Sequence, residues 1–416
     1  MPDPHLSKPK PHPRTELRRS IGLTLLVFYG LGTTIGAGIY VLIGATVARA
    51  GAQAPLSFLL AAVVMAFSAA SFAEFSGRIP QAAGEAAYVE AGFGWPWLAL
   101  GTGLAMVFAA SVSSAAIALG ATGYIGTLLP APAPLLTVAV VGGIAVLAGW
   151  GVRESVGFAA VMTVIEILGL AAIIGAGLLG DPGMLSDLPD TLPAPGDGTA
   201  WAGVMGASLI AFFAFIGFDD MVNLVEETRD PARTMPRAIL LTLATVTVLY
   251  VLVVFVAVRA VPPAELAASD APVGLLFHRL TGLSPVAITL IAIVATLNGI
   301  IIQMIMAARV LYGLARRGAL PARLGRVHPR SRTPVAATAL IGAFVLALAL
   351  VFPLDRLAET TSTVILTVFT LVNLALIRVK RSGVAAPAGV FTVPGVVPVL
   401  GAIFSAALLA GSLWFG

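Results

Sequence analysis

Two glycine-containing stretches in apolar surroundings have the chemistry to bind a small dipolar solute. Gly36–Gly38 lies inside "YGLGTTIGAGIYVLIG", and Gly217 lies inside "FFAFIGFDD". Glycines inside a helix favour unwinding, and an unwound turn leaves unpaired N–H groups that bind anions at the start of the next half-helix. Carbonyls freed at a second break would accept hydrogen bonds from a cation. Two such breaks, meeting at mid-membrane, suit a zwitterion such as an α-amino acid.

The first glycine stretch also has two other readings. Gly30, Gly32 and Gly36 loosely match the dinucleotide-binding pattern GxGxxG, which requires a preceding strand and a soluble helix. Because the stretch lies inside a membrane-length apolar run, that reading is rejected. Gly32 and Gly36 also form a GxxxG pair, which lets membrane helices approach closely. Helix packing therefore stays open as an alternative to unwinding.

Glu166 is the most isolated acid within an apolar run, in "VMTVIEILGLAAII". Ionisable residues inside membrane segments are costly and are candidates for function. Apolar surroundings favour the neutral carboxyl over the anion, so Glu166 could load and release a proton. The alternative is a structural carboxyl that stays neutral or pairs with a neighbour.

Sodium is the second candidate for the coupling ion. Thr296 and Asn298, in "IVATLNGIIIQ", offer oxygen atoms of the kind that hard cations prefer, and Glu166 could add its charge. The alternative for this pair is hydrogen bonding between helices. Asp219 and Asp220 follow the second break, where they either line the inward path or pair with cytoplasmic arginines.

The composition indicates a protein that lies mostly in lipid. Of its 416 residues, 58% are hydrophobic and 11% are charged, against about 25% charged in a soluble domain. Mean hydropathy is +0.99. There is no cysteine, and the four histidines have no metal-ligand spacing, so we expect no metal site and no cofactor. No nucleic-acid-binding motif occurs.

Apolar runs of spanning length predict eleven transmembrane helices, since a helix needs about 20 residues to cross a bilayer and lipid offers no partner for free backbone groups. The predicted spans are 21–47, 54–76, 96–126, 133–150, 155–179, 200–224, 236–260, 284–314, 335–352, 359–377 and 394–414. Three acids that flank the second and third spans, Glu74, Glu85 and Glu90, are expected at the membrane interface.

The distribution of basic residues predicts the orientation of these spans. With a cytoplasmic N-terminus, only Arg49, Arg259, Arg279 and Arg356 of the 24 Lys and Arg residues lie outside, as the positive-inside rule requires. The basic run 309–332 is expected to contact lipid headgroups. The odd number of spans then leaves the C-terminus outside.

Four stretches resemble the amino acid–polyamine–organocation superfamily, in its cationic amino acid transporter-like branch. They are "TTIGAGIYVLIG", "GRIPQAAGEAAYVEAGFGWPWLALGTG", "FFAFIGFDDMVNLVEETRDPARTMPRAI" and "AARVLYGLARRGALPARLGRVHPRSRTPVAAT". The resemblance implies an all-α, LeuT-like fold, with a five-plus-five inverted repeat and broken first and sixth helices. It divides the chain into a cytoplasmic tail (1–20), a first repeat (21–180), an extracellular linker (181–199), a second repeat (200–380), and a loop with a final helix (381–416).

The same resemblance implies secondary, ion-coupled transport of amino acids. Carried over by position, it implies that the amides of Ile35, Gly36, Ala37 and Gly38 bind the substrate carboxylate. The residues implied to accept from the amine, and the aromatic gate over the site, are Phe213, Ala214, Ile216 and, as the gate, Phe218.

This chain departs from the family pattern in three places. Ala37 stands where relatives often have Ser or Thr, so a hydroxyl contact to the carboxylate is lost. Glu166 lies near a position where proton-coupled relatives often carry a lysine. The superfamily usually has twelve helices where eleven are predicted here.

The function expected is proton-coupled uptake of small neutral amino acids, with a sodium symporter or an exchanger as the alternative. A site built from backbone recognises the groups that all amino acids share, so the label "cationic" is not transferred. A membrane enzyme would need convergent catalytic groups, and a channel a ring of selectivity groups; the sequence shows neither.

Overall fold

The computed structural model describes residues 19–80, 84–150, 156–316, 318, 320–329, 331 and 333–415. Most of the predicted tail, 1–20, therefore lies outside the described residues. The described part is nearly all helical, and its long helices are α1 (Leu23–Ala50), α2 (Ala54–Arg78), α4 (Pro96–Leu128), α5 (Ala133–Trp150), α6 (Val156–Gly180), α7 (Gly198–Ala214), α8 (Pro231–Ala260), α11 (Val286–Arg316), α12 (Val335–Val351), α13 (Leu354–Arg381) and α14 (Val396–Phe415).

Shorter helical segments connect these helices. They are α3 (Gly84–Phe93), α9 (Pro263–Ala267), α10 (Pro272–Thr281) and the 3-10 segments η1 (Gly51–Gln53), η2 (Met184–Thr191) and η3 (Asp219–Glu227). Several helices, among them α2, α4 and α8, begin with proline in the first two positions, where the missing N–H has no intrahelical partner to lose.

Ten of the eleven predicted spans each fall on one long helix, and the sixth, 200–224, covers α7, a turn and part of η3. Eight described stretches are long and apolar enough to cross a membrane, and the first of them, Leu23–Arg78, contains both α1 and α2. Two shorter apolar helices, Val335–Val351 and Val396–Gly411, account for the remaining predicted spans. The chain is thus a multi-pass membrane protein.

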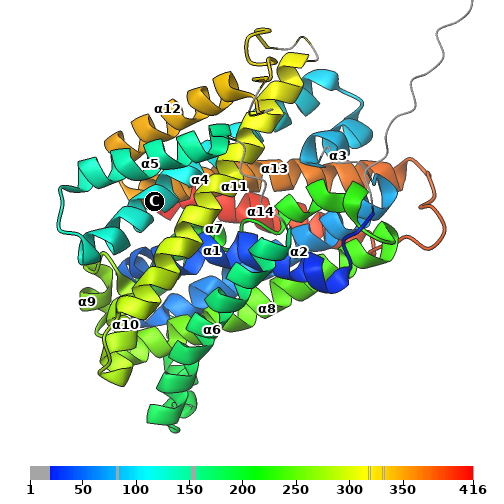
Figure 1. Cartoon of the computed structure of the whole chain (residues 1–416). Helices are drawn as coiled ribbons and strands as arrows, with labels where there is room; N and C mark the ends of the chain where they lie inside the picture. The colour runs from blue at the N-terminus through cyan, green and yellow to red at the C-terminus, as the bar shows by residue number, and fades with distance from the viewer. Residues whose placement is uncertain are drawn as a thin grey trace, which may run out of the picture.

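The two halves of the chain pack against each other through corresponding helices. α1 packs against α7, α2 against α8, α4 against α11, and α5 against α12. Figure 1 shows α5 and α12 side by side and α1 and α7 near the centre of the bundle. This pairing places the two glycine stretches in contact.

Candidate functional site

The sixth predicted span is interrupted, as the sequence predicts. α7 ends at Ala214, a turn follows, and η3 continues from Asp219. Gly217 has φ +131°, and a Cβ there would lie 2.7 Å from the Thr33 carbonyl oxygen, so only glycine fits. The Asp219 carboxylate accepts a hydrogen bond from the Gly217 amide at 2.9 Å. The break is thus stabilised from within its own sequence.

The first span is not interrupted, and this prediction was wrong. α1 is one α-helix from Leu23 to Ala50 and runs through Gly36–Gly38, so its amides pair within the helix. Gly38 instead permits close packing, because a Cβ there would lie 2.4 Å from the Cα of Ala214. Helix packing, the alternative reading of these glycines, is what the structure shows. The side chain of Ala37 lies outside the described part of the structure.

The two breaker segments nevertheless meet, as the sequence predicts. The Thr33 hydroxyl donates to the Gly217 carbonyl at 3.0 Å, and Ile35, one turn from Gly38, is fully buried. The carbonyl oxygens of α1 and α7 are joined by a residue that the sequence analysis missed. The Tyr250 hydroxyl lies 2.8 Å from the Thr34 oxygen and 3.1 Å from the Ala214 oxygen.

The available signal for Tyr250 was its isolation among aliphatic residues in "LTLATVTVLYVLVVF". A tyrosine hydroxyl in such a run needs a partner when it is buried. Of the other predicted acceptors, Ile216 is half-buried and Phe213 has a local partner. The Phe213 carbonyl accepts from the Ile216 amide at 3.1 Å, which closes the first turn of the break.

Phe218, the predicted aromatic gate, is 1% exposed and lies in an aromatic cluster. Its ring centroid is 5.6 Å from that of Phe72 and 5.7 Å from that of Phe369. Tyr88 packs edge-on to Phe72 and stacks on Phe75. These rings pack together where α2, α3, α13 and the residue before η3 meet.

Glu166 lies against the glycine segment of α1, on α6. It is 2% exposed, and neither carboxyl oxygen has a hydrogen-bond partner among the described residues. Its Oε1 atom is 3.6 Å from where a Cβ on Gly36 would stand, and the Ala295 carbonyl oxygen is 3.2 Å from the same point. Tyr40 of α1 donates to the backbone carbonyl of Glu166 at 3.0 Å.

Gly36 and Gly38 thus face different partners. Gly38 faces Ala214 at the end of α7, whereas Gly36 faces Glu166 and Ala295. The interrupted sixth span, which consists of α7, the break and η3, is called helix six below and is distinct from α6. The expected hydrogen bonding of Thr296 between helices is wrong, because its hydroxyl bonds the carbonyls of Ala292 and Ile293 in its own helix. The Oδ1 atom of Asn298 is buried without a hydrogen-bond partner in the described part of the chain.

Two acids near the break are buried, and for Glu85 this contradicts the expected position at the membrane interface. Glu85 is 7% exposed and Asp219 is 2% exposed. Burial, followed by repulsion from Asp219, raises the pKa of Glu85 to about 8. Asp219 forms no ion pair among the described residues, so pairing with an arginine does not explain it.

Glu74 is also buried, and its partners explain why. Its carboxylate pairs with Arg78 at 2.8 Å and with Lys380 at 2.7 Å, and it accepts the Val393 amide at 2.8 Å. These contacts join α2, α13 and the segment before α14. The third acid, Glu90, is exposed as expected.

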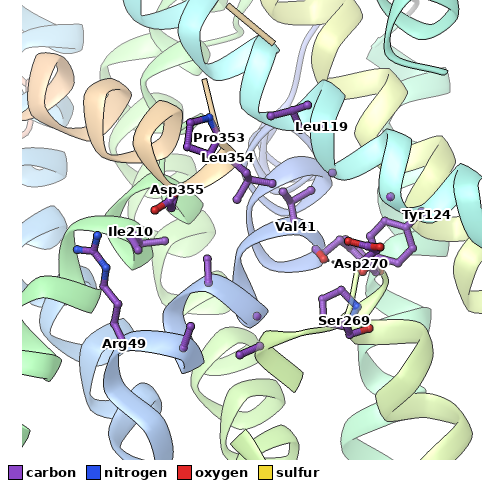
Figure 2. Close-up of a pocket in the computed structure, with 18 residues that line it drawn as sticks. Val41, Arg49, Leu119, Tyr124, Ile210, Ser269, Asp270, Pro353, Leu354 and Asp355 are labelled. Carbon is purple, nitrogen blue, oxygen red and sulfur yellow. Dashed lines mark hydrogen bonds between the residues drawn. The ribbon is translucent and has the colours of Figure 1, made fainter. Parts of the chain in front are cut away.

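A cavity of about 410 Å³ lies beside the C-terminal half of α1. Its wall comes from α1, α4, α7, α13 and the segment around α9 and α10 (Figure 2). The Tyr124 hydroxyl bonds the Tyr40 carbonyl at 2.6 Å and accepts the Val273 amide at 3.4 Å. One residue of α4 thereby joins α1 to α10 beside the cavity.

Comparison with known proteins places this architecture in a family. A profile described as "Amino acid permease" matches residues 21–415. The chain belongs to the amino acid permease family. This confirms the superfamily resemblance that the four sequence stretches indicate.

Relatives and a solved structure agree with this assignment. The branched-chain amino acid permease BcaP of Bacillus subtilis (strain 168) is 29% identical, over 96% of this chain and 89% of that protein. Cationic amino acid transporter 4, vacuolar, of Arabidopsis thaliana is 32% identical, over 88% of this chain and 64% of that protein. MhsT, solved in complex with L-phenylalanine, has a TM-score of 0.63 at 11% identity, covering 95% of this chain and 99% of that one. The fold of this permease is LeuT-like.

Proposed function

We propose that this permease carries amino acids across the cell membrane as a secondary active transporter. The observation that carries the proposal is the interruption of helix six at Gly217, directly against the glycine segment of α1. Irregular backbone at membrane depth is tolerated where it lines a cavity or lies buried in protein. The names of its relatives, permeases and transporters of amino acids, support transport over an enzymatic reaction.

The substrate would bind between α1 and helix six once these segments part. Gly38 and Ala214 touch through their backbones, so the centre is closed in this conformation. Unwinding at Gly36–Gly38 would release amides for the carboxylate, and the carbonyls of Phe213, Ala214 and Ile216 would accept from the ammonium group. Small neutral amino acids are the substrates we favour, because the surrounding side chains are mostly aliphatic or aromatic.

Protons are the coupling ion that we favour, with Glu166 as the carrier. A carboxyl without a partner in a buried site is stable when neutral, and it gains a partner when the adjacent α1 segment rearranges. Sodium is the second candidate, because the Ala295 carbonyl oxygen faces the same Gly36 position as Glu166 and hard cations prefer such oxygens.

The division of the chain into two repeats, a linker and two terminal segments, predicted from the sequence, is part of this proposal. The repeats would span 21–180 and 200–380, joined by the linker 181–199, with the tail 1–20 in the cytoplasm and the end of 381–416 outside. The pairing of α1 with α7 and of α2 with α8 supports a repeat of this kind.

Uptake into proteoliposomes tests the proposal. Purified protein is given labelled leucine, alanine, lysine or glutamate under an imposed proton gradient, a sodium gradient, or neither. We expect accumulation above equilibrium with the proton gradient and saturable counterflow without it. Accumulation with the sodium gradient alone would show that sodium, and not the proton, is the coupling ion. Absence of counterflow for every amino acid would overturn the proposed function.

A further inference from the structure

Tyr250 lies on α8, at the contact between α1 and the break in helix six, and it is not among the proposed substrate contacts. Its side chain is fully buried. Its hydroxyl lies 2.8 Å from the Thr34 carbonyl oxygen of α1 and 3.1 Å from the Ala214 carbonyl oxygen at the end of α7. Because a phenol carries one proton, the two carbonyls share a single donor.

The Ala214 carbonyl depends on this hydroxyl more than the Thr34 carbonyl does. The amides of the next two residues bond the Phe212 and Phe213 carbonyls, and the third amide bonds the Asp219 carboxylate. None of the described backbone amides bonds the Ala214 carbonyl. Thr34, in contrast, lies inside a continuous α-helix, where its carbonyl also accepts an amide from the next turn.

Two aromatic rings fix the direction of the Tyr250 side chain. Phe58 of α2 meets it edge-on, with ring centroids 5.9 Å apart, and the ring centroid of Phe215, the first residue of the break, is 5.2 Å away. The ring centroids of Phe58 and Phe215 are themselves 6.4 Å apart. The three rings pack as one buried cluster, which keeps the hydroxyl at the contact between α1 and helix six.

The contact between α1 and helix six leaves no room for a solute in this closed conformation. A Cβ on Gly38 would lie 2.4 Å from the Ala214 Cα, so nothing fits between the two backbones, and Ala214 is fully buried. A buried acceptor that loses its donor costs free energy, because it has given up its hydrogen bond to water. The centre can therefore close at low cost only when some group donates to the Ala214 carbonyl.

We propose that Tyr250 is a positioning residue whose hydroxyl gives the Ala214 carbonyl, in the closed and empty carrier, the hydrogen bond that the substrate ammonium gives in the loaded carrier. The inference rests on the proposed function, in which the ammonium group binds this same carbonyl. It adds the group that takes the place of the substrate when the carrier closes without one.

The Ala214 carbonyl then has a donor at each stage of transport. In the open forms, water reaches the carbonyl. In the loaded and closed form, the ammonium group donates to it and the hydroxyl is left to Thr34. In the empty and closed form, the hydroxyl donates to Ala214. Tyr250 thereby lets the empty carrier return across the membrane, which net transport requires and exchange of one amino acid for another does not.

Net efflux and exchange from proteoliposomes separate these steps. Vesicles loaded with labelled leucine are diluted into buffer without leucine, which measures net efflux, or with excess unlabelled leucine, which measures exchange. Both fluxes use the loaded carrier, and only net efflux also uses the empty one. We expect Tyr250→Phe to lower the ratio of net efflux to exchange about fivefold or more, the scale for a buried acceptor left without its donor.

Tyr312→Phe is the matched control variant. Tyr312 lies near the end of α11, is half-buried and forms no hydrogen bond with the rest of the described chain. The variant loses the same hydroxyl group as Tyr250→Phe, and it should keep the parent's ratio of net efflux to exchange.

Fluorine NMR of a protein with 3-fluorotyrosine in place of Tyr250 is a second measurement, and this protein keeps the hydroxyl. We expect saturating leucine to shift the fluorine resonance, because the ammonium group displaces the hydroxyl from the Ala214 carbonyl.

The outcomes are distinguishable. If the parent exchanges no amino acid, the proposed function itself fails. If the parent exchanges leucine and Tyr250→Phe keeps the parent's ratio, the role of Tyr250 is overturned while the transporter stands. If Tyr250→Phe shows no exchange at all, the fluorine resonance decides, and a resonance that leucine leaves unchanged overturns the role of Tyr250.

Discussion

Glu166 is the residue whose chemistry most directly sets the coupling mechanism. It is buried, its carboxyl has no hydrogen-bond partner in the described chain, and it faces the Gly36 segment. Glutamine preserves its size but cannot release a proton. We therefore expect Glu166→Gln to keep leucine counterflow while losing accumulation driven by a proton gradient and the pH dependence of the initial rate between pH 5.5 and 8.

Two control variants sharpen this measurement. Glu90→Gln changes an exposed acid of α3 and should behave as the parent. Thr296→Val removes a hydroxyl that bonds its own helix, so proton-driven uptake should survive. A Glu166→Gln protein with the parent's pH dependence would eliminate Glu166 as the carrier, and loss of sodium-driven uptake in Thr296→Val would favour sodium.

Gly38 of α1 packs closely against Ala214 at the end of α7, and we expect a substitution there to destabilise the protein. A Cβ at this position would lie 2.4 Å from the Ala214 Cα and 2.7 Å from its carbonyl oxygen. Backbone atoms cannot rotate away, so Gly38→Ala should destabilise the protein by about 1–3 kcal/mol, the usual cost of overpacking. Thermal unfolding in detergent measures this change.

The matched control for Gly38 lies in α4. Gly101 has open space around its Cβ position, so Gly101→Ala should be neutral or stabilising by the gain in helix propensity, at most about 1 kcal/mol. Equal unfolding temperatures for the two variants would contradict the tight contact between α1 and helix six.

At the scale of elements, the sequence predicted where the helices lie but not which of them breaks. Run lengths of apolar residues placed all eleven long helices, because lipid requires each span to satisfy its own backbone. Gly36–Gly38 and Gly217 carried the same breaker signal. The difference is that Asp219 accepts the freed Gly217 amide, while hydrophobic Ile39 and Tyr40 follow Gly38. A capping acceptor next to the glycine is thus part of the signal.

Partners distant in sequence could not be predicted from one chain. Glu74 was expected at the interface because acids are costly in lipid, yet it is fully buried against Lys380, 306 residues later. Tyr250 was overlooked for the same reason, since its acceptors belong to α1 and α7. Such contacts depend on how helices pack, which periodicity does not specify.

The ion pairs and hydrogen bond of Glu74 join α2, α13 and the segment before α14, so we expect their loss to lower the stability of the folded protein. Removing the Glu74 carboxylate leaves Arg78 and Lys380 without their counter-charge, and the side chains of these two residues are only 10% and 19% exposed. Breaking a buried pair costs about 3–5 kcal/mol, and we expect Glu74→Ala to approach this range in thermal unfolding. Glu90→Ala, which removes an exposed acid, should cost much less; equal losses would show that the pairing does not stabilise the protein.

Across the whole molecule, the helices of the two halves form two closures around α1 and helix six. On one side, Tyr124 joins α4, α1 and α10 beside the cavity at the C-terminal half of α1. On the other, the amides of Ser20 and Ile21 bond the Glu227 carbonyl, and the Arg229 amide bonds the Ile21 carbonyl. The N-terminal end of α1 and the C-terminal end of η3 are therefore linked through their backbones, and we expect them to move as one unit. In the proposed orientation this contact is the inner closure.

The inner closure should depend on pH through Glu85. This residue is on α3 and faces Asp219 on η3, and its pKa is raised to about 8 from the ordinary value of 4.5 by burial and by Asp219. A raised pKa means that the closed state binds the proton more tightly than an opened, solvated state. The contribution of Glu85 to the stability of the closure is therefore fully present below pH 4.5 and is lost as the pH rises toward about 8.

A single introduced thiol measures this closure, because the chain has no cysteine of its own. Val222 is fully buried and lies against Gly84 at the contact between α3 and η3, whereas Ala91 on α3 is exposed. The ratio of maleimide labelling rates of Val222→Cys and Ala91→Cys cancels the ionisation of the thiol itself. We expect the ratio to rise several-fold from pH 5 to 8 and to become constant when Glu85→Gln is added, since glutamine holds no titrating proton. If the rise is the same with Glu85→Gln, another group governs the inner closure.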